Sequence, residues 1–354
     1  MRRLISRIFP TAAIAVMISL LIAGCGGGKD NNDHLDNDKF EMLVEYIEQN
    51  GDFINTDASP GAVNASEVME NIDKNIHIID IRTPEDYAAG HISKAVNVSF
   101  SDLIDYFENK IEASGFEKIY LFSSDGQAAF FASGLLRLLG YDNVYPVRFG
   151  MCAWHEDYAV EYWLRNLTSL YSDKLVNEDN PIPENGDYPV IKSEFNTGYE
   201  ILRERAIELL QHPYKDYVVT ADEVFASPEN YHIICYWKKE YFDLGHIPGA
   251  IHYAPKKSLS RETQLSTLPL DKTIVLYCNS GNHSSTVAAY LRILGYDAKS
   301  LYYGANSFMY NIMMEETDQA FDDDKIMNYP LEKSEKSDVP VENESKKPVP
   351  QGGC

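Results

Sequence analysis

Cys278 is the residue of this 354-residue sequence whose surroundings best fit a reactive nucleophile. It follows the apolar run 273–277, and Gly281 and a segment with helical spacing come soon after it. In open parallel sheets, reactive groups gather at the carboxyl ends of the strands. A short glycine-containing loop can point backbone N–H groups at an anion, and the N-terminus of the next helix adds positive partial charge. Both effects favour the charged form of a thiol, so the sequence predicts that Cys278 is largely thiolate.

The loop after Cys278 supplies the candidate groups for holding a small anion. These are Asn279, Ser280, Gly281, Asn282, His283 and Ser284. The spacing predicts a helix over residues 285–294, with Ser284 or Ser285 as its N-cap and Gly295 at its end. For His283 two interpretations stay open: the imidazole polarises a substrate, or it faces solvent.

The sequence repeats itself at a constant offset of 155 residues. The landmarks that coincide are Gly90-His91-Ile92 with Gly245-His246-Ile247, Glu85 with Glu240, Gly126 with Gly281, and residues 136–142 with 291–297. One offset shared by separate landmarks predicts two copies of one domain. At the position of Cys278 the first copy has Ser123, whose hydroxyl has no adjacent base in its motif and is therefore a poor nucleophile. The first copy is therefore predicted to be inactive and structural.

Short β-rich runs alternate with helical patterns inside each copy. The predicted strands cover residues 76–81, 118–122 and 143–147 in the first copy, and 231–236, 273–277 and 299–303 in the second. Strands separated by helices form parallel sheets whose two faces are both covered. The predicted fold class is therefore α/β, with two domains that are each a parallel sheet covered by helices on both faces.

Composition sets the predicted boundaries of these units. The expected order is a signal peptide at 1–24, a flexible tether at 25–38, the first domain at 39–173, a connection at 174–196, the second domain at 197–327, and a tail at 328–354. Apolar residues at helical spacing predict a helix over 40–49. The tail is rich in Pro, Lys, Glu and Ser, and it is expected to be disordered because such a segment cannot form a core.

The motifs around Cys278 resemble those of the rhodanese sulfurtransferases. The resemblance is carried by Cys-x-x-Gly after a strand, by Glu240 to Ala250 upstream of it, and by Asp80 to Ile92 in the first copy. It covers roughly residues 62 to 165 and 218 to 315. It implies a persulfide on Cys278 as the intermediate, a small sulfur donor, a thiol acceptor, and neither a metal ion nor an organic cofactor.

The second copy departs from the family pattern in two places. Where the family has Asp-x-Arg, this copy has Cys235-Tyr236-Trp237, and where it has an arginine near the end of the loop, this copy has His283. A loop that offers only an imidazole predicts that thiosulfate, a dianion, is a poor substrate. Phosphatases of the same fold have an arginine that grips phosphate, whereas this chain has Ser284 in that place, so phosphoryl chemistry is disfavoured.

The other cysteines and two histidines receive simpler interpretations. Cys235 is expected to pack in the core, with a role as resolving thiol as the alternative. Cys354, at the end of the tail, is either a mobile sulfur acceptor or an incidental terminal residue. Cys152 is expected in the core. His91 and His246 are expected to hold turns, because both copies have the histidine and only one has the nucleophile.

The amino-terminal residues predict export and lipidation. Three arginines precede an apolar run at 11–23 that is short for a membrane span, a pattern typical of a secretory signal. The run ends in Leu21-Ile22-Ala23-Gly24-Cys25, which resembles the lipobox of bacterial lipoproteins and implies a lipid on Cys25. The expected location is membrane-anchored, on the periplasmic or cell-surface side. A net charge of −23 argues against a nucleic-acid partner.

The sequence therefore predicts an exported, lipid-anchored sulfurtransferase that moves sulfane sulfur from a small donor to a thiol or another nucleophile through Cys278. Two alternatives stay open. One is a thiol redox or chalcogen-handling protein acting on polysulfide or selenium oxyanions. The other is a binding module of the same fold without turnover.

Overall fold

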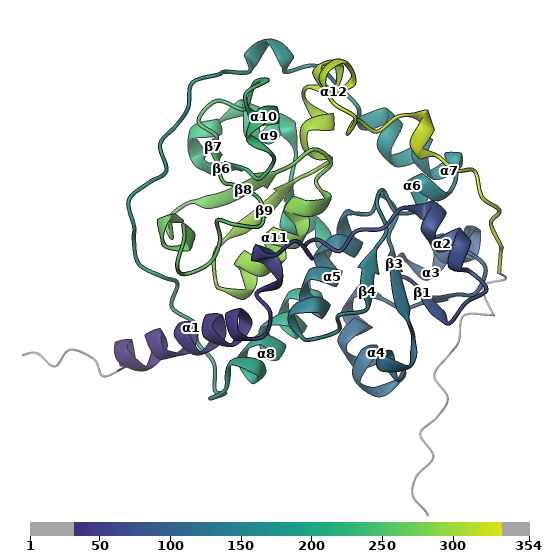
Figure 1. The fold of residues 1–354 in the computed structure, drawn as a ribbon, viewed down its shortest axis with the longest axis horizontal. Coiled ribbons are helices and arrows are strands. Elements are labelled where there is room, and N and C mark those ends of the chain that lie inside the picture. Colours follow the sequence, from purple (N-terminus) through teal and green to yellow (C-terminus); the bar gives the residue numbers. More distant parts are fainter. Residues whose placement is uncertain (1–31, 335–354) are drawn as a thin grey trace, which may run out of the picture.

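The computed structural model describes residues 32–334, which form two α/β units of matching topology (Figure 1). The first unit follows α1 (Asn32–Gln49) and contains α2 (Ala65–Asn71), β1 (Ile76–Asp80), α3 (Pro84–Ala89), β2 (Ala95–Asn97), α4 (Leu103–Asn109), β3 (Lys118–Phe122), α5 (Gln127–Leu138), β4 (Val144–Pro146), α6 (Met151–Trp154) and α7 (Glu156–Tyr158). The second contains α8 (Gly198–Leu210), β5 (Val218–Val219), α9 (Ala221–Ala226), β6 (Tyr231–Cys235), α10 (Lys239–Phe242), β7 (Ile251–His252), β8 (Thr273–Tyr277), α11 (Asn282–Ile293), β9 (Ala298–Leu301) and α12 (Tyr310–Glu316).

Both sheets are parallel, as predicted. The first has the strand order β2-β1-β3-β4 and the second β5-β9-β8-β6-β7. Ile78 pairs with Tyr120 in the first sheet, and Ile233 pairs with Val275, the residues 155 positions later, in the second. The shared offset shows that the repeat in the sequence is a repeat of structure, and the α/β fold class is confirmed.

Strand boundaries agree with the prediction to within one or two residues, and β3 and β8 have the predicted bounds. The start of α11 differs, because the helix begins at Asn282 with Gly281 as its N-cap. The expectation that Ser284 or Ser285 caps it is wrong. Gly281 has a φ of 76°, which glycine adopts without a steric penalty, and Ser285 Oγ donates to the Gly281 carbonyl at 2.6 Å from within the first turn.

Helix α1 contains the predicted helix 40–49 and starts inside the segment predicted as tether. Its buried apolar residues are Phe40, Leu43, Val44 and Ile47. The connection 174–196 has no regular helix beyond a short turn and lies along the second unit, where Val176 N donates to the His246 carbonyl at 3.0 Å. Tyr188 stacks on Phe40 with ring centroids 4.5 Å apart, so the connection covers one side of α1.

Residues 317–334, the C-terminal strap, return from the second unit across the first (Figure 1). Met327 N donates to the Ala153 carbonyl, Tyr329 N to Trp154, and Glu332 N to His91, at 2.8 to 2.9 Å. The composition predicts disorder from residue 328, yet the chain is placed as far as 334. The strap needs no core of its own, because main-chain hydrogen bonds and the packing of Tyr329 on Trp154 hold it.

Helices α5 and α11 lie side by side between the two sheets (Figure 1). They are equivalent elements of the two copies, and Gly134 of α5 lets Thr286 of α11 approach closely. Thr286 Oγ1 donates to the Phe130 carbonyl at 3.1 Å. One cluster of buried apolar side chains contains residues of both copies, so the two units share part of their core.

Candidate active site

Cys278 follows the last residue of β8, a strand that pairs with β6 on one side and β9 on the other. Cys278 is buried, with 2% of its surface exposed to solvent. The Ser284 hydroxyl lies 3.7 Å from the sulfur and is itself 2.8 Å from the Ser300 hydroxyl. The predicted position of Cys278, at the carboxyl end of a central parallel strand and before a helix, is therefore what the fold has.

The turn after β9 packs against the loop that follows Cys278 and hydrogen-bonds its backbone. Tyr303 and Gly304 both have positive φ, and a Cβ at Gly304 would lie 2.3 Å from the Cys278 carbonyl oxygen. Ala305 N donates to that carbonyl at 2.9 Å, and the Asn306 side chain donates to the Asn279 carbonyl at 2.7 Å. The backbone of the loop is thus fixed by residues distant in sequence.

A cavity of about 610 Å³ opens at Cys278 between the two copies. The predicted loop residues Asn279, Ser280, Asn282 and His283 line it together with Cys278. Gly281 and Ser284 do not line the cavity. They shape the loop instead, through the helix cap and the hydroxyl beside the sulfur.

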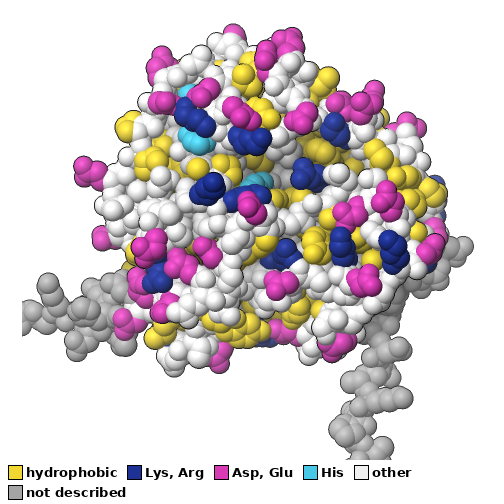
Figure 2. Space-filling view, viewed as in Figure 1, with side chains coloured by type: hydrophobic (Ala, Val, Ile, Leu, Met, Phe, Trp, Pro, Cys, Tyr) yellow, Lys and Arg dark blue, Asp and Glu magenta, His cyan; other side chains and the backbone are white. Residues whose placement is uncertain are grey.

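Cationic side chains from outside the loop line this cavity. They are Arg148, Lys238, Lys256 and Lys325. Figure 2 shows Lys and Arg side chains around a hollow at the centre of this face, with Asp and Glu mostly toward its edge. The loop itself offers only the imidazole of His283, as expected, but the cavity gains cations from the first copy, from the segments after β6 and β7, and from the strap.

Arg148 is the cation whose placement bears most directly on the thiol. Arg148 follows β4 of the first copy. Its guanidinium interacts electrostatically with Cys278 of the second copy. Burial lowers the pKa of Arg148 and the nearby Cys278 opposes that shift, although a guanidinium stays protonated in either case. Lys238, Lys256 and Lys325 each have a carboxylate within 4.0 Å, whereas no carboxylate of the described chain pairs with Arg148.

His283 lines the cavity and is neutral there. Burial, followed by the positive charges of Lys256 and Arg148, lowers its pKa to about 3. Its Nε2 lies 3.3 Å from the buried hydroxyl of Ser59, a residue of the first copy, and its ring packs edge-on against Tyr236. Of the two interpretations, solvent exposure does not fit these contacts. A neutral imidazole can polarise a ligand by hydrogen bonding but brings no positive charge.

Asn282 contributes an acceptor without a protein partner. The residue is 4% exposed, and its buried Oδ1 has no hydrogen bond within the described part of the chain. Buried polar atoms are almost always hydrogen-bonded. Because Asn282 lines the cavity, a ligand N–H or O–H group is the natural donor to this oxygen.

Of the other cysteines, the structure describes Cys235 and Cys152. Cys235 is fully buried at the end of β6, and burial raises its pKa to about 12, so its thiol is protonated. These facts favour packing, and a role as resolving thiol stays a prediction. Cys152 is buried with its Sγ donating to the Ser124 carbonyl at 3.1 Å, as expected of a core residue. Cys25 and Cys354 lie outside the described residues.

His91 and His246 are placed as turn-holding residues. Each is buried, and each Nδ1 bonds the carbonyl four residues earlier, Tyr87 for His91 at 2.9 Å and Phe242 for His246 at 3.2 Å. Neither residue lines the cavity at Cys278. The shared geometry explains why both copies have the histidine although only one has the thiol.

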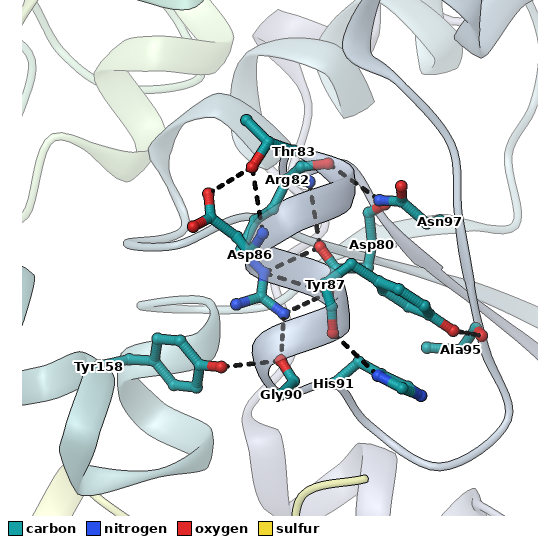
Figure 3. A network of polar contacts seen from close by, with 10 residues as sticks. All are labelled: Asp80, Arg82, Thr83, Asp86, Tyr87, Gly90, His91, Ala95, Asn97 and Tyr158. Carbon is teal, nitrogen blue, oxygen red and sulfur yellow. Dashed lines mark hydrogen bonds and ion pairs between the residues drawn. The ribbon is translucent and has the colours of Figure 1, made fainter. Parts of the chain in front are cut away.

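The first copy has a buried ion pair between Asp80 and Arg82 (Figure 3). Arg82 donates to both oxygens of Asp80 and, through Nη2, to the Gly90 carbonyl at 2.7 Å. Burial would lower the pKa of Arg82, but Asp80 raises it above its ordinary value. The second copy has Tyr236 and Trp237 in this region, and both line the cavity.

Sequence reasoning missed Arg148, Lys256 and the strap residue Lys325. Arg148 has no motif around it, and in the repeat its counterpart is Tyr303, so the internal alignment hides it. Lys256 has a φ of 65°, which a sequence does not reveal. Arg148 and Lys256 come soon after β4 and β7, at the carboxyl ends of parallel strands. That position is the one signal in the sequence that could have indicated that they lie near the site.

Comparison with known proteins identifies the family to which the two domains belong. The family model for the rhodanese-like domain matches residues 64–157 and 227–310. Thiosulfate sulfurtransferase GlpE of Pseudomonas entomophila (strain L48) is 32% identical over 85 residues, which are 24% of this chain and 74% of that protein. The chain belongs to the rhodanese-like family and contains two of its domains.

The similarity to solved structures is weaker. A rhodanese-related protein from Thermoplasma volcanium matches with a TM-score of 0.24 and 20% identity, over 32% of this chain and 95% of that one. A thiosulfate sulfurtransferase from Pseudomonas aeruginosa matches with a TM-score of 0.27 and 15% identity, over 75% of this chain and 45% of that one. The family assignment rests on the family model and the curated relative.

Proposed function

We propose that this protein transfers sulfane sulfur through a persulfide on Cys278. The observation that carries the proposal is the position of this thiol at the end of β8, in a cavity where Arg148 has no carboxylate partner among residues 32–334. A cation of this kind balances the charge of a persulfide anion or of an anionic donor. The first copy has Ser123 in the equivalent place and serves as scaffold.

The reaction is a double displacement. Thiolate Cys278 attacks the outer sulfur of the donor, the donor's S–S bond breaks, and the remainder leaves, as sulfite when the donor is thiosulfate. An acceptor thiolate then attacks the outer sulfur of the Cys278 persulfide, which frees Cys278 and produces a persulfide on the acceptor. Charge and sulfur balance in both steps, and neither step needs an external oxidant.

The cavity supports an organic molecule as one of the two substrates. Its volume of about 610 Å³ falls in the range typical of organic ligands, well above what a small inorganic anion fills. Arg148 suits a carboxylate, and the unpartnered Asn282 Oδ1 suits an N–H donor. A thiol or persulfide with both groups, of which cysteine is the simplest, meets these requirements.

No metal ion has a part in this proposal. Within residues 32–334, no group of three or more His, Cys, Asp or Glu side chains converges on a possible ion site. The chemistry above uses a thiolate, hydrogen-bond donors and fixed cations alone.

We also propose that the protein is exported and anchored by a lipid on Cys25, on the strength of the amino-terminal residues described above. No helix in the described residues is long and apolar enough to cross a membrane. Replacing Cys25 with Ser should leave an unprocessed precursor without lipid. Continued cleavage before residue 25, together with tight membrane association, would contradict the anchor.

Mass spectrometry of the purified protein tests the sulfur chemistry. The protein is exposed in turn to thiosulfate, polysulfide and cysteine persulfide, and then to cysteine as acceptor. The peptide that contains Cys278 should gain the mass of one sulfur atom with at least one donor and lose it to the acceptor. A disulfide between Cys278 and another cysteine, formed instead of the persulfide, would favour the thiol redox alternative.

A further inference from the structure

The inactive copy keeps a loop at the position of the nucleophile, and this loop contacts the second copy. Asp125 in it is 5% exposed, although no cation is within ion-pairing distance in the described chain. Its Oδ1 accepts the Gln127 backbone N–H at 3.0 Å, and its Oδ2 accepts the hydroxyl of Tyr302 at 2.5 Å. Burial raises the pKa of this carboxyl, and these hydrogen bonds oppose the shift.

Gln127 is the residue of this loop that reaches the Cys278 loop. It is fully buried, and its Oε1 accepts the backbone N–H of Tyr303 at 3.1 Å. The same oxygen lies against Gly281, where a Cβ would be only 2.1 Å away. One amide oxygen of the first copy therefore contacts both the Cys278 loop and the turn that supports it.

The turn supported by Gln127 controls the backbone next to the nucleophile. Tyr303 and Gly304 hold left-handed conformations, which is costly for the tyrosine. Their geometry brings Ala305 N to the Cys278 carbonyl at 2.9 Å and Gly304 against Gly281 N. Loss of the Gln127 acceptor would leave the buried Tyr303 N–H unpaired, and the strained turn would relax.

We propose that Gln127, fixed by Asp125, is a positioning residue for the Cys278 loop. Asp125 orients the start of α5, and Gln127 Oε1 clamps the Tyr303–Gly304 turn against Gly281. The backbone of the loop around Cys278 is thereby kept in place for the reacting sulfur. The inference rests on the proposed sulfur transfer, and it gives the copy without a nucleophile a direct part in it.

Gln127→Met tests the clamp, because methionine keeps the length of the side chain and removes the acceptor. We expect kcat for sulfur transfer from thiosulfate to cysteine to fall about tenfold, since small misplacements of a reacting group have large effects on rate. KM for thiosulfate should change by less than about twofold. Alkylation of Cys278 by iodoacetamide at pH 7 should slow by a similar factor to kcat, because a displaced loop no longer presents the sulfur to the cavity in the same position.

Ser133→Ala is the matched control. Ser133 is buried on the same helix, and its hydroxyl donates at 3.1 Å to the Phe130 carbonyl of that helix rather than to the Cys278 loop. Its variant should keep kcat and the alkylation rate. If Gln127→Met lowers the thermal unfolding midpoint while kcat and the alkylation rate equal those of the wild type, Gln127 is only structural and the inference is overturned.

Tyr302→Phe provides the second variant, in case Gln127→Met does not fold. It removes the hydroxyl that donates to Asp125 and keeps the ring. It should slow alkylation of Cys278 in the same direction by a smaller factor, about two- to threefold, and an unchanged rate would count against the clamp. Alkylation needs no sulfur donor, so it tests the clamp even if the wild type forms no persulfide and the proposed function fails.

Discussion

The two copies have the same strand order around their central strands and the same offset in sequence, but they use the carboxyl edge of the sheet differently. The first has Ser123 after β3 and buries the Asp80–Arg82 ion pair after β1. The second has Cys278 after β8, and Tyr236 and Trp237 line its cavity. At the carboxyl edge of the sheet, the first copy therefore has a buried ion pair, whereas the second copy has residues that line a cavity.

The comparison also shows that the copies are not independent. The first copy supplies Arg148 and Ser59 to the site of the second. In return, Tyr302 of the second copy hydrogen-bonds the buried Asp125 of the first. The loop that has Ser123 in place of a thiol is therefore constrained as well, because it forms part of the boundary between the copies.

The largest effect should come from exchanging the residues that distinguish the copies. Cys278→Ser should abolish persulfide formation with every donor, because a hydroxyl cannot carry the sulfur. Ser123→Cys should not restore it, since the Ser123 loop is occupied by the contacts of Asp125 and Tyr302. Peptide mass spectrometry after treatment with thiosulfate measures both. Sulfur uptake by the Cys278→Ser protein would contradict the assignment, and Cys152→Ser is the control for loss of a buried thiol.

The ion pair of the first copy should matter for stability rather than chemistry. Arg82→Met leaves the Asp80 carboxylate buried without its partner and should lower the free energy of unfolding by about 3 to 5 kcal/mol. Denaturant unfolding measures the change. Asp73→Asn, which removes an exposed ion pair with Lys94, is the control and should cost less than about 1 kcal/mol. An equal loss in the two variants would show that the buried pair has no special role.

Arg148→Met tests whether the first copy contributes charge to the reaction. We expect kcat/KM with thiosulfate to fall about 10- to 100-fold, the effect of losing one charged hydrogen bond of about 1.5 to 3 kcal/mol. Two acceptors make the test more specific. The rate of sulfur transfer to cysteine should fall more than the rate of transfer to cysteamine, which lacks the carboxylate. Arg165→Met, a change on the first copy outside the cavity lining, is the control. Equal effects on the two acceptors would remove the carboxylate from the proposed role of Arg148.

The smallest effect concerns pH and the neutral imidazole at the boundary. The folded pKa of His283 is lowered to about 3, so the unfolded chain takes up the proton first as the pH falls below about 6.5. Stability associated with His283 is therefore complete above that pH and is lost toward pH 3. His283→Gln should reduce the loss of unfolding free energy between pH 7 and pH 4 by roughly 1 to 3 kcal/mol.

Two other histidines calibrate this measurement. Burial also lowers the pKa of His232, to about 4, so a similar acid sensitivity remains in the His283→Gln protein. His212 is exposed, and His212→Gln should leave the pH dependence as in the wild type. A pH dependence that is the same in His283→Gln and the wild type would mean that His283 can be protonated in the folded protein.

Much of the fold and the position of Cys278 could be predicted from the residues. The repeat, the positions of β3 and β8, and the placement of Cys278 before a helix depend on patterns a few residues long, which local geometry enforces. The N-cap of α11 could not be predicted, because the choice between Gly281 and the serines depends on a positive φ. Residues 328–334 were expected to be disordered because composition measures the capacity to form a core, whereas the strap is held by main-chain hydrogen bonds to the first copy.

The sequence by itself determined that the chain has two copies of one α/β domain, and that only the second has a thiol after its central strand. These facts are local, since a strand, a loop glycine and a helix are each encoded by neighbouring residues. The tertiary structure decided that Arg148 lines the same cavity as Cys278, that burial lowers the pKa of His283, and that Gln127 touches Gly281. Each of these depends on how α5 and α11 pack together, because the charge and the hydrogen bonds at the site come from residues more than a hundred positions apart.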